Sequence, residues 1–473
     1  MESIWRKTCE IEKRPSLRED IKTEAAIIGG GMAGILAAYQ LQKAGISVVV
    51  LEAGEIAGGQ TQNTTAKITS QHGMICHTFL KQKGEETARK YMQANQEAIR
   101  EYEKIIEEEN ITCDFEQTDS YVYSGEEEKL QEEVKAAKVL GINADFVKDI
   151  EIPLSCAGGI RFPKQAQFHP LKFIKGISAK LKIYENTKVK EVKDHQLITE
   201  EGNVKAEKII FASHYPFINF PGMYFTRMHQ ERSYVLALEH AGRLKGMYIG
   251  DEPYSYSFRQ YGDYVLLGGR GHRTGENKGG RFDNLRIAAE LFFPESREVT
   301  CWSAQDCMTS DQIPFIGTYA SSRPDWLVST GFQKWGMTSS MVSAMLLKDQ
   351  ICGIQNPYSE VFSSLRFSAE EIPQIMKEGK KAVKGLAKRM LQIPEGTAKM
   401  LHTGQGKIME IKGEKTGVYK SEEDEIFMVD VKCPHMGCQL EWNQDERTWD
   451  CPCHGSRFDY QGRLKEGPAQ EGI

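Results

Sequence analysis

Residues 25–41 read AAIIGGGMAGILAAYQL, and residues 47–53 read SVVVLEA. The first apolar run has the length of a short buried strand. Glycines follow it at once, and the residues after them have helical spacing up to Gly45, a suitable position for a helix C-cap. The second apolar run reads as another buried strand. Strand, glycine-rich turn, helix and strand in this order predict an α/β domain with a nucleotide site at the turn.

The glycines of this turn fit the pattern G-x-G-x-x-G at Gly29, Gly31 and Gly34. They permit a tight turn and a close approach of the backbone to a pyrophosphate, and the helix start offers free N–H groups. Glu52 ends the second strand, where a carboxylate can bond the ribose hydroxyls of an adenosine. A turn that binds nothing is the alternative, and the strand–helix–strand context counts against it. The turn alone leaves NAD and FAD open.

Bulk properties limit the class of protein. The chain has 473 residues, which predicts two or three domains, and 40% hydrophobic with 27% charged residues is ordinary globular composition. The formal net charge is −6 without a basic block, so we expect no nucleic-acid partner. No long apolar run predicts a membrane span, and the polar N-terminus does not resemble a signal peptide. We therefore expect a cytoplasmic protein.

Two short loops near the other end hold an unusual set of side chains. They read CPHMGC at 433–438 and CPCHGSRF at 451–458, and four of the eleven cysteines lie in them. Two thiolates and two imidazoles also suit a structural zinc ion. The additional cysteines Cys438 and Cys453, and the Gly455-Ser456 pair, weigh against zinc.

The remaining sequence gives a coarse organisation. Helical patterns cover 85–109, 126–140 and 338–352, and strand-like segments recur through 205–270. A Lys-rich helical stretch at 369–400 reads as a link, and short strands with glycine turns follow it. The glycines of GGRGHRTGE at 268–276 precede no helical pattern, so we expect no second dinucleotide domain.

Four segments resemble flavoproteins of the D-amino-acid oxidase family. They are AGGQTQNTTAKITSQHG (57–73), EKIIFASHYPF (207–217), TSDQIPFIG (309–317) and GFQKWGMTSS (331–340). The resemblance spans roughly 1–370 and implies FAD as the cofactor. The FAD contacts that it implies, together with the glycine turn, are Gly29, Gly31, Gly34, Glu52, Gln60, Thr61, Thr65, Lys67, Val189, Ala212, Ser213, Gly331, Gly336, Met337 and Thr338.

The two loops near the C-terminus closely resemble the Rieske 2Fe–2S family. The resemblance implies Cys433 and Cys451 as ligands of one iron, and His435 and His454 as ligands of the other. It also implies a disulfide between Cys438 and Cys453. High-potential members carry a tyrosine where this chain has Phe458, so we expect a lower reduction potential.

Together these resemblances predict the fold class. We expect an α/β FAD-binding domain, Rossmann-like and of the glutathione-reductase type (family 2), with an interleaved α+β substrate domain and a small all-β Rieske domain. The FAD-dependent oxidoreductase would occupy 1–375, the linker 376–397 and the Rieske domain 398–473. Within the first, FAD-binding segments would cover about 21–80, 165–220 and 305–375, and the substrate domain about 81–164 and 221–304.

Rieske domains also occur in aromatic-ring oxygenases, which need a mononuclear iron on two histidines and one carboxylate. His72 and His77 have a suitable spacing, but Thr69 stands where the carboxylate is needed. We expect both histidines to belong to the fold of the flavin segment instead.

The predicted function combines both cofactors. FAD takes two electrons from a small amine, amino acid or hydroxy acid, and the cluster passes them singly to an external acceptor, a redox protein or a quinone. A dehydrogenase fits better than an oxidase. Candidates for the substrate side are Arg259, Arg270, His272 and Trp335. Two alternatives stay open: an electron-transfer module without a small-molecule substrate, and a redox sensor.

Overall fold

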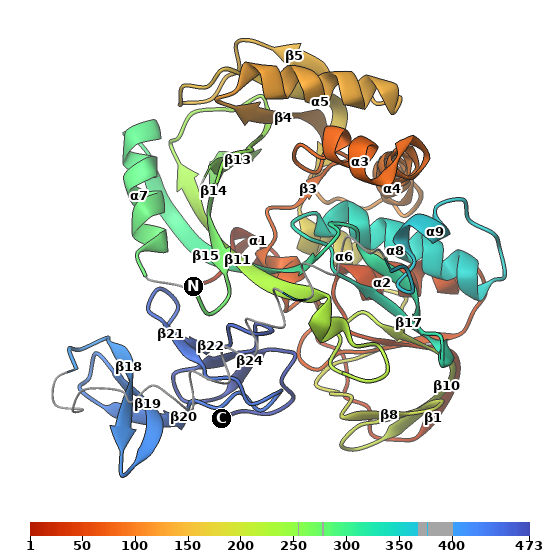
Figure 1. Ribbon diagram of the computed structural model, residues 1–473. Coiled ribbons are helices and arrows are strands. Elements are labelled where there is room, and N and C mark those ends of the chain that lie inside the picture. The colour runs from red at the N-terminus through yellow and green to blue at the C-terminus, as the bar shows by residue number, and fades with distance from the viewer. Residues whose placement is uncertain (254, 277–278, 368–375, 377–400) are drawn as a thin grey trace.

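The structure is a computed structural model of the chain (Figure 1). It describes residues 1–253, 255–276, 279–367, 376 and 401–473. Most of the described residues lie in two large mixed sheets with their helices, and two small sheets form the C-terminal part. The predicted linker at 376–397 lies, apart from residue 376, outside the described residues, as does most of the helical pattern at 369–400.

The first large sheet contains the predicted strand–helix–strand unit. Strand β1 lies between β10 and β2, and these strands are parallel, with β17 and β7 continuing the parallel order on either side. Helix α2 returns the chain from β1 to β2, as a parallel pair requires. The strands of this sheet are β16 (Phe315–Ala320), β17 (Arg323–Thr330), β10 (Asn203–Phe211), β1 (Ile21–Ile28), β2 (Val48–Leu51), β7 (Ile183–Tyr184), β8 (Glu191–Lys193) and β9 (Gln196–Ile198).

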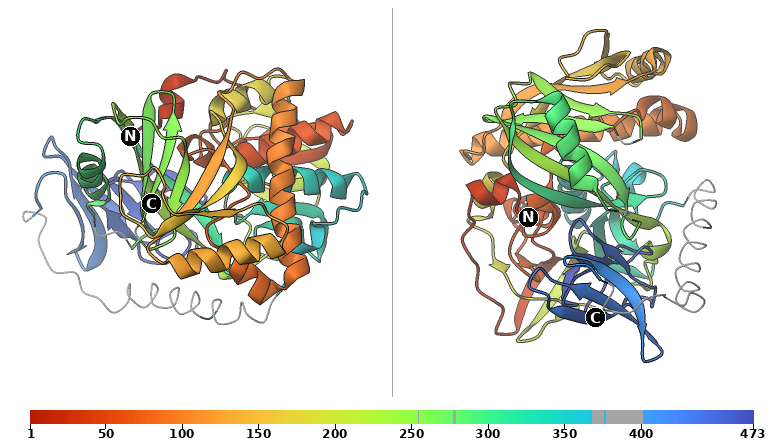
Figure 2. Two further views of the ribbon diagram at one scale, coloured as in Figure 1. Left: turned by 90° about the horizontal axis from the view of Figure 1, so that it is seen from above. Right: turned by 90° about the vertical axis from the view of Figure 1, so that its left-hand side faces the viewer.

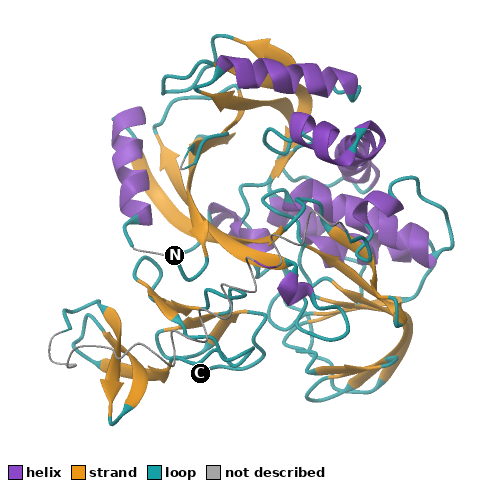
Figure 3. Cartoon of the chain, in the orientation of Figure 1, coloured by secondary structure: helices purple, strands orange, loops and turns teal. Residues whose placement is uncertain are grey.

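Helices α2 and α8 pack together beside this sheet, and α4 packs against α8 (Figure 3). Their apolar faces join strand β1 in one buried core, which holds Ile27, Leu36, Tyr102 and Met341. The predicted helices at 85–109, 126–140 and 338–352 correspond to α4, α5 and α8. The helices are α1 (Ile4–Thr8), α2 (Met32–Lys43), η1 (Gln60–Asn63), α3 (Cys76–Lys83), α4 (Glu85–Glu108), α5 (Glu127–Val139), α6 (Pro170–Ser178), η2 (Tyr224–Thr226), α7 (Arg281–Phe292), α8 (Gly336–Ile351) and α9 (Ser359–Phe362).

The second large sheet is mostly antiparallel. Helix α7 packs on β11 and β14, and α5 packs near β6 at the other end, as Figure 1 shows. The strands are β15 (Arg297–Thr309), β11 (Met228–Glu239), β14 (Tyr264–Arg273), β13 (Tyr256–Tyr261), β12 (Gly246–Gly250), β4 (Glu116–Ser124), β6 (Gly158–Gln167), β3 (Lys67–Ile68) and β5 (Asp145–Val147). Strands β11 and β15 are long and run side by side toward the first sheet (Figure 1).

One expectation about this sheet is corrected. A helix, α7, does follow the glycine-bearing stretch 268–276, because its pattern begins only at Arg281. The stretch nevertheless begins within β14, which pairs antiparallel with β11 and β13. A dinucleotide turn needs a parallel strand that leads directly into its helix. This segment is therefore no second dinucleotide turn.

The C-terminal part is all-β, as the sequence predicts. It has a three-stranded and a four-stranded antiparallel sheet, coloured blue in Figure 2. The strands are β18 (Gly406–Ile411), β19 (Glu414–Lys420), β20 (Ile426–Asp430), β21 (Glu441–Asn443), β22 (Thr448–Asp450), β23 (Arg457–Asp459) and β24 (Leu464–Glu466). None of the helices in the described part of the chain is long and apolar enough to cross a membrane.

Candidate flavin and iron–sulfur sites

The glycine turn between β1 and α2 is built for close approach of two backbones. Gly29 has φ +111°, and a Cβ there would lie 2.5 Å from the carbonyl oxygen of Ala212. A Cβ on Gly34 would collide with the carbonyl oxygen of Gly29. The first glycine therefore sets the turn, and Gly34 lets the helix pack on the strand.

Glu52 and Thr61 hold this turn from the side. Glu52 Oε2 accepts a hydrogen bond from Gly30 N at 2.7 Å, and Thr61 Oγ1 accepts one from Met32 N at 2.9 Å. Burial raises the pKa of Glu52, and the backbone N–H groups that it accepts from oppose this shift. Both side chains face the cavity that opens at the turn.

This cavity has a volume of about 1480 Å³ and runs between the two large sheets. It is large enough for a dinucleotide, because drug-sized ligands occupy cavities of roughly 300–1,000 Å³. Its wall contains every predicted FAD contact except three. The predicted contacts that line it are Gly29, Gly31, Glu52, Gln60, Thr61, Thr65, Lys67, Val189, Ala212, Ser213, Gly336 and Met337.

The three exceptions are Gly34, Gly331 and Thr338. Gly34 packs on Gly29 as described above. Gly331 has φ +74°, and a side chain there would collide with Thr309. Thr338 is 1% exposed, and its hydroxyl donates to the carbonyl oxygen of Thr69 at 3.0 Å. These residues shape the cavity from behind its wall rather than line it.

Lys67 is the most unusual group in the cavity wall. Burial lowers its pKa from 10.5 to about 7, and the nearby charge of Arg259 adds to this shift. No hydrogen-bond acceptor for its Nζ is found among the described residues, although the side chain faces the cavity. A lysine that faces a cavity without a protein partner fits a site where a ligand supplies the acceptor.

We expect Lys67→Met to stabilise the FAD-free protein near neutral pH. The folded pKa lies below the unfolded one, so unfolding takes up a proton between pH about 7 and pH 10.5. The loss in free energy of unfolding that the buried Lys67 charge causes is therefore largest below pH 7 and disappears above pH 10.5. Thermal unfolding of both proteins across this range should show a gain for the variant that shrinks as pH rises. A gain that stays constant with pH would contradict the assignment.

The four substrate-side candidates separate into two pairs. Arg270 and Trp335 line the cavity, whereas Arg259 and His272 do not. Arg259 is 1% exposed, and its guanidinium donates to Gln167 Oε1 and to the carbonyl oxygens of Thr65 and Phe168. Arg259 therefore fixes the chain behind the cavity and does not face it, contrary to expectation.

His272 is also directed elsewhere. Its Nε2 lies 2.9 Å from the Tyr234 hydroxyl, and its Nδ1 lies 2.7 Å from the carbonyl oxygen of Arg273. Both ring nitrogens are thus occupied within the protein, so His272 belongs to the structure of the second sheet.

Arg270 and Trp335 keep positions suited to a ligand. The Arg270 guanidinium lies 5.0 Å from the centroid of the Tyr256 ring and donates to the Tyr256 hydroxyl. Its Nε is buried and has no hydrogen-bond partner among the described residues. Trp335 stacks on His72 at 4.8 Å between ring centroids, at the start of α8. Tyr256 lines the same cavity and was not identified from the sequence.

His72 and His77 do not form the iron site of an oxygenase. The ring nitrogens of His72 lie 2.7 Å from the Tyr91 hydroxyl and 2.9 Å from the carbonyl oxygen of Thr69. His77 is the second residue of helix α3 and lies exposed. Because His72 is fully engaged in hydrogen bonds, it holds the fold of the cavity wall, as expected.

The two cysteine–histidine loops face each other at the edge of the four-stranded sheet. The rings of His435 and His454 lie 4.9 Å apart between centroids and are perpendicular. Burial lowers the pKa of His435 to about 4 and the pKa of His454 to about 3. Both imidazoles are therefore neutral at pH 7, the form that binds metal.

The ring nitrogens of these histidines fit a metal cluster. Both Nδ1 atoms are buried and have no hydrogen-bond partner in the described part of the chain. On the opposite side of the rings, His435 Nε2 lies 2.8 Å from Asn219 Oδ1, and His454 bonds the backbone of Phe225. Ligating histidines use one nitrogen for the metal and the other for an outer hydrogen bond. The free Nδ1 atoms are thus the ligand atoms that a cluster would use.

The sulfur atoms complete this set. The thiols of Cys433 and Cys451 are buried and hydrogen-bonded to each other, and this bond lowers the pKa of Cys433. The sulfurs of Cys438, Cys451 and Cys453 also lie within 4.8 Å of one another. Two of these three form a disulfide and cannot bind a metal as thiolates. Cys433 and Cys451 are therefore the available sulfur ligands.

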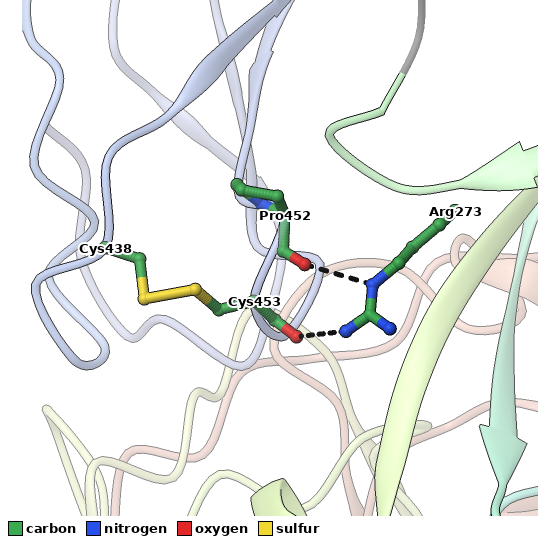
Figure 4. The surroundings of a disulfide bond; sticks show 4 residues. All are labelled: Arg273, Cys438, Pro452 and Cys453. Atoms are coloured by element: carbon green, nitrogen blue, oxygen red, sulfur yellow. Dashed lines mark hydrogen bonds between the residues drawn. A yellow bond between two sulfur atoms is a disulfide. The ribbon is translucent and has the colours of Figure 1, made fainter. Parts of the chain in front are cut away.

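The disulfide between Cys438 and Cys453 is confirmed and joins the two loops (Figure 4). Figure 4 also shows Arg273 of β14, whose guanidinium donates to the carbonyl oxygens of Pro452 and Cys453, both at 3.2 Å. The second loop is thus held both to the first loop and to the second large sheet.

We expect the hydrogen bonds to the sulfurs to set the reduction potential of a bound cluster. The Ser456 hydroxyl bonds Cys433, and Phe458 is fully buried in the same core cluster as the four cysteines. Phe458→Tyr should raise the midpoint potential and Ser456→Ala should lower it, each by roughly 2 kcal/mol for one electron, the scale of a hydrogen bond to a charged group. Redox titration followed by electron paramagnetic resonance measures both. No rise in Phe458→Tyr would contradict the assignment.

Comparisons with known proteins agree with both sites. Residues 24–350 match the family model for FAD dependent oxidoreductases, and residues 392–473 match that for the Rieske [2Fe-2S] domain. The chain is 37% identical to the Rieske 2Fe-2S iron-sulfur protein YhfW of Bacillus subtilis (strain 168), with 99% of this chain and 96% of that protein covered. It is 36% identical over 81 residues to the cytochrome b6-f complex iron-sulfur subunit of Synechococcus elongatus, covering 17% of this chain and 45% of that protein.

Solved structures share the fold of the first part. Glycine oxidase from Geobacillus kaustophilus aligns with a TM-score of 0.62 at 17% identity, covering 74% of this chain and 100% of that one. L-proline dehydrogenase from P. horikoshii aligns with a TM-score of 0.62 at 17% identity, covering 76% and 99%. The cofactors are FAD in the first part and a 2Fe–2S cluster in the second. The chain thus belongs to the FAD dependent oxidoreductase family and carries a C-terminal Rieske [2Fe-2S] domain.

Proposed function

We propose that this oxidoreductase is a dehydrogenase that passes electrons singly from FAD through the Rieske cluster to an external acceptor. One observation carries the proposal: residues 464–470 of the Rieske domain form part of the wall of the cavity that begins at the glycine turn. FAD takes electrons in pairs from a carbon centre, whereas a Rieske cluster takes them one at a time. A flavin cavity whose wall includes part of the Rieske domain suits conversion between these modes.

The proposed substrate is a small amine, amino acid or hydroxy acid. Arg270 and Tyr256 offer a cation and a hydroxyl at the cavity wall, and a carboxylate is the natural partner of a guanidinium. Trp335 forms an apolar part of the same wall. Among the three substrate classes, this pair favours the two that carry a carboxylate.

We also propose the division of residues and roles that the sequence implies. The predicted FAD contacts hold FAD, most of them from the cavity wall, and Cys433, His435, Cys451 and His454 hold the cluster. The strands of the first sheet come from the proposed FAD-binding segments, which supports that division. The external acceptor is a one-electron carrier, either a redox protein or a quinone.

Anaerobic mixing of the holoenzyme with panels of amino acids, hydroxy acids and amines tests the proposal. Oxidation of one substrate releases two electrons and two protons, so each substrate consumed should reduce two equivalents of a one-electron acceptor such as ferricyanide. Flavin bleaching by a panel member, followed by reduction of the cluster, is the expected result. Bleaching only by a reduced redox protein would favour the electron-transfer module instead. In a parallel assay under air, oxygen consumption that outpaces acceptor reduction would favour an oxidase.

A further inference from the structure

The loop that holds Cys451 and His454 is docked on the second large sheet. Strands β11, β14 and β15 all contribute hydrogen bonds to it. His454 is 5% exposed, whereas Met436, the neighbour of His435, is 42% exposed. The second loop is therefore buried against the second large sheet, whereas the first loop touches the flavin part through His435 and Asn219 and exposes Met436 to solvent.

The side chain of Gln230 joins the cavity wall to this loop. Gln230 of β11 lines the cavity, and its Nε2 donates to the carbonyl oxygen of His454 at 2.6 Å. The same Nε2 lies 3.3 Å from the carbonyl oxygen of Gly467. Gln230 is 2% exposed, so it fills the wall between the two sites.

Gln305 of β15 supports this contact with a second amide. Its Nε2 donates to Gln230 Oε1 at 2.7 Å and to the carbonyl oxygen of Gly455 at 2.9 Å. Its backbone N–H donates to Gln60 Oε1 at 2.7 Å, and Gln60 lines the cavity. A connected set of amides therefore runs from the cavity to the loop that carries His454.

The backbones at this interface approach too closely for side chains. Gly455 has φ +81°, and a Cβ there would lie 2.7 Å from Gln230 Cβ. Gly275 has φ +78°, and a Cβ there would lie 2.5 Å from Pro452 N. Two glycines on opposite sides of the interface, both in the left-handed region, thus fix how close the loop and the sheet can come.

A buried ion network fixes the same arrangement. Arg232 of β11 is 1% exposed and donates to both carboxylate oxygens of Glu446, each at 2.6 Å. Burial alone would raise the pKa of Glu446, but Arg232 and Arg457 outweigh it and hold that pKa at about 2. A bidentate buried pair has a fixed geometry, so the cluster domain is held in one orientation.

We propose that electrons enter the cluster through the loop that carries His454, and that Gln230 and Gln305 are positioning residues that hold this loop against the cavity wall. This proposal rests on the proposed function, since it needs electrons to arrive on FAD. Each transfer moves one electron from reduced FAD to one iron of the cluster. Two transfers, each followed by loss of the electron to an external one-electron acceptor, return FAD to its oxidised state, and the two substrate protons pass to solvent.

The test measures transfer inside the holoenzyme without a substrate. A laser flash in the presence of a deazaflavin and EDTA delivers one electron to the flavin, and absorbance and freeze-quench electron paramagnetic resonance report its arrival at the cluster. We expect transfer to be about tenfold slower in Gln230→Met, the change that loss of one buried hydrogen bond makes in a docking equilibrium. The midpoint potentials and the resonance spectrum of the cluster should stay unchanged.

Gln165→Met is the matched control, because Gln165 is also a buried glutamine with a hydrogen bond to backbone and lies away from the cavity wall. It should transfer at the wild-type rate. If Gln230→Met loses its cluster, Gln305→Met takes its place, since it removes the amide that donates to Gln230 Oε1 and to the carbonyl oxygen of Gly455 and changes no residue of either cluster loop. Electron transfer at the wild-type rate, in either variant with its full content of FAD and cluster, would overturn the proposal. A slower transfer that is explained by a changed midpoint potential of the cluster would overturn it as well.

The same measurement separates this proposal from the proposed function. If light-driven electron transfer depends on Gln230 but no amino acid, hydroxy acid or amine of the panel bleaches the flavin, the route through the His454 loop is supported and the dehydrogenase function is rejected. If a substrate bleaches the flavin but neither variant slows electron transfer to the cluster, the dehydrogenase function is supported and the route through the His454 loop is rejected.

Discussion

His454→Ala should abolish the cluster and leave the flavin half active. The variant loses one of two imidazoles whose Nδ1 atoms are buried without a hydrogen-bond partner among the described residues. We expect complete loss of the Rieske resonance signal, together with iron and acid-labile sulfide. FAD content and anaerobic bleaching should remain near wild type, because the glycine turn and the cavity wall do not include His454. Reduction of a one-electron acceptor should fall to the background level of free reduced flavin.

His195→Ala provides the control for a histidine on the flavin side, since His195 lies in the turn between β8 and β9, outside the cavity wall. It should keep both cofactors and full acceptor reduction. Retention of a full iron and sulfide content in His454→Ala would exclude His454 as a ligand. Loss of FAD along with the cluster would instead show that the docked Rieske domain is needed to close the cavity.

Local patterns explain why much of this architecture is predictable from sequence. The β1–α2–β2 unit needs only consecutive residues, so Gly29 and Glu52 indicate its site before any tertiary contact is known. The cluster loops are equally local, because each places a cysteine and a histidine within four residues. In both cases the chemistry constrains spacing along the chain, and spacing is what a sequence displays.

The incorrect and missing predictions concern residues whose surroundings depend on contacts between distant parts of the chain. Arg259 and Arg270 lie on paired strands, β13 and β14, yet one faces protein and the other faces the cavity. The packing of the sheets decides which face of a strand borders a cavity, and the local sequence of the strand does not reveal that packing. Gln230 was missed for a similar reason, since its partner His454 is 224 positions away. A signal did exist: Gln230 and Arg232 place two polar side chains on the same face of a strand, where burial demands partners.

Arg270→Met should separate substrates by whether they carry a carboxylate. The Arg270 guanidinium is pinned by Tyr256 at the cavity wall, and its buried Nε lacks a partner among the described residues. If it binds the substrate carboxylate, its loss leaves that charge unpaired, which lowers kcat/KM by about 100-fold. The amine that corresponds to the same amino acid without its carboxylate gains nothing from Arg270. The ratio of flavin reduction rates for this substrate pair is therefore the quantity to measure.

Arg243→Met serves as the control, because Arg243 is exposed and forms a surface ion pair with Asp263. It should change neither rate. Equal losses for acid and amine in Arg270→Met would mean that Arg270 maintains the cavity wall through Tyr256 rather than binding substrate. Unchanged rates for both would remove the carboxylate from the proposed substrate. A loss confined to the acid, with FAD content and the cluster spectrum intact, is the result that assigns Arg270 to substrate recognition, because a structural defect has no means of distinguishing the two molecules.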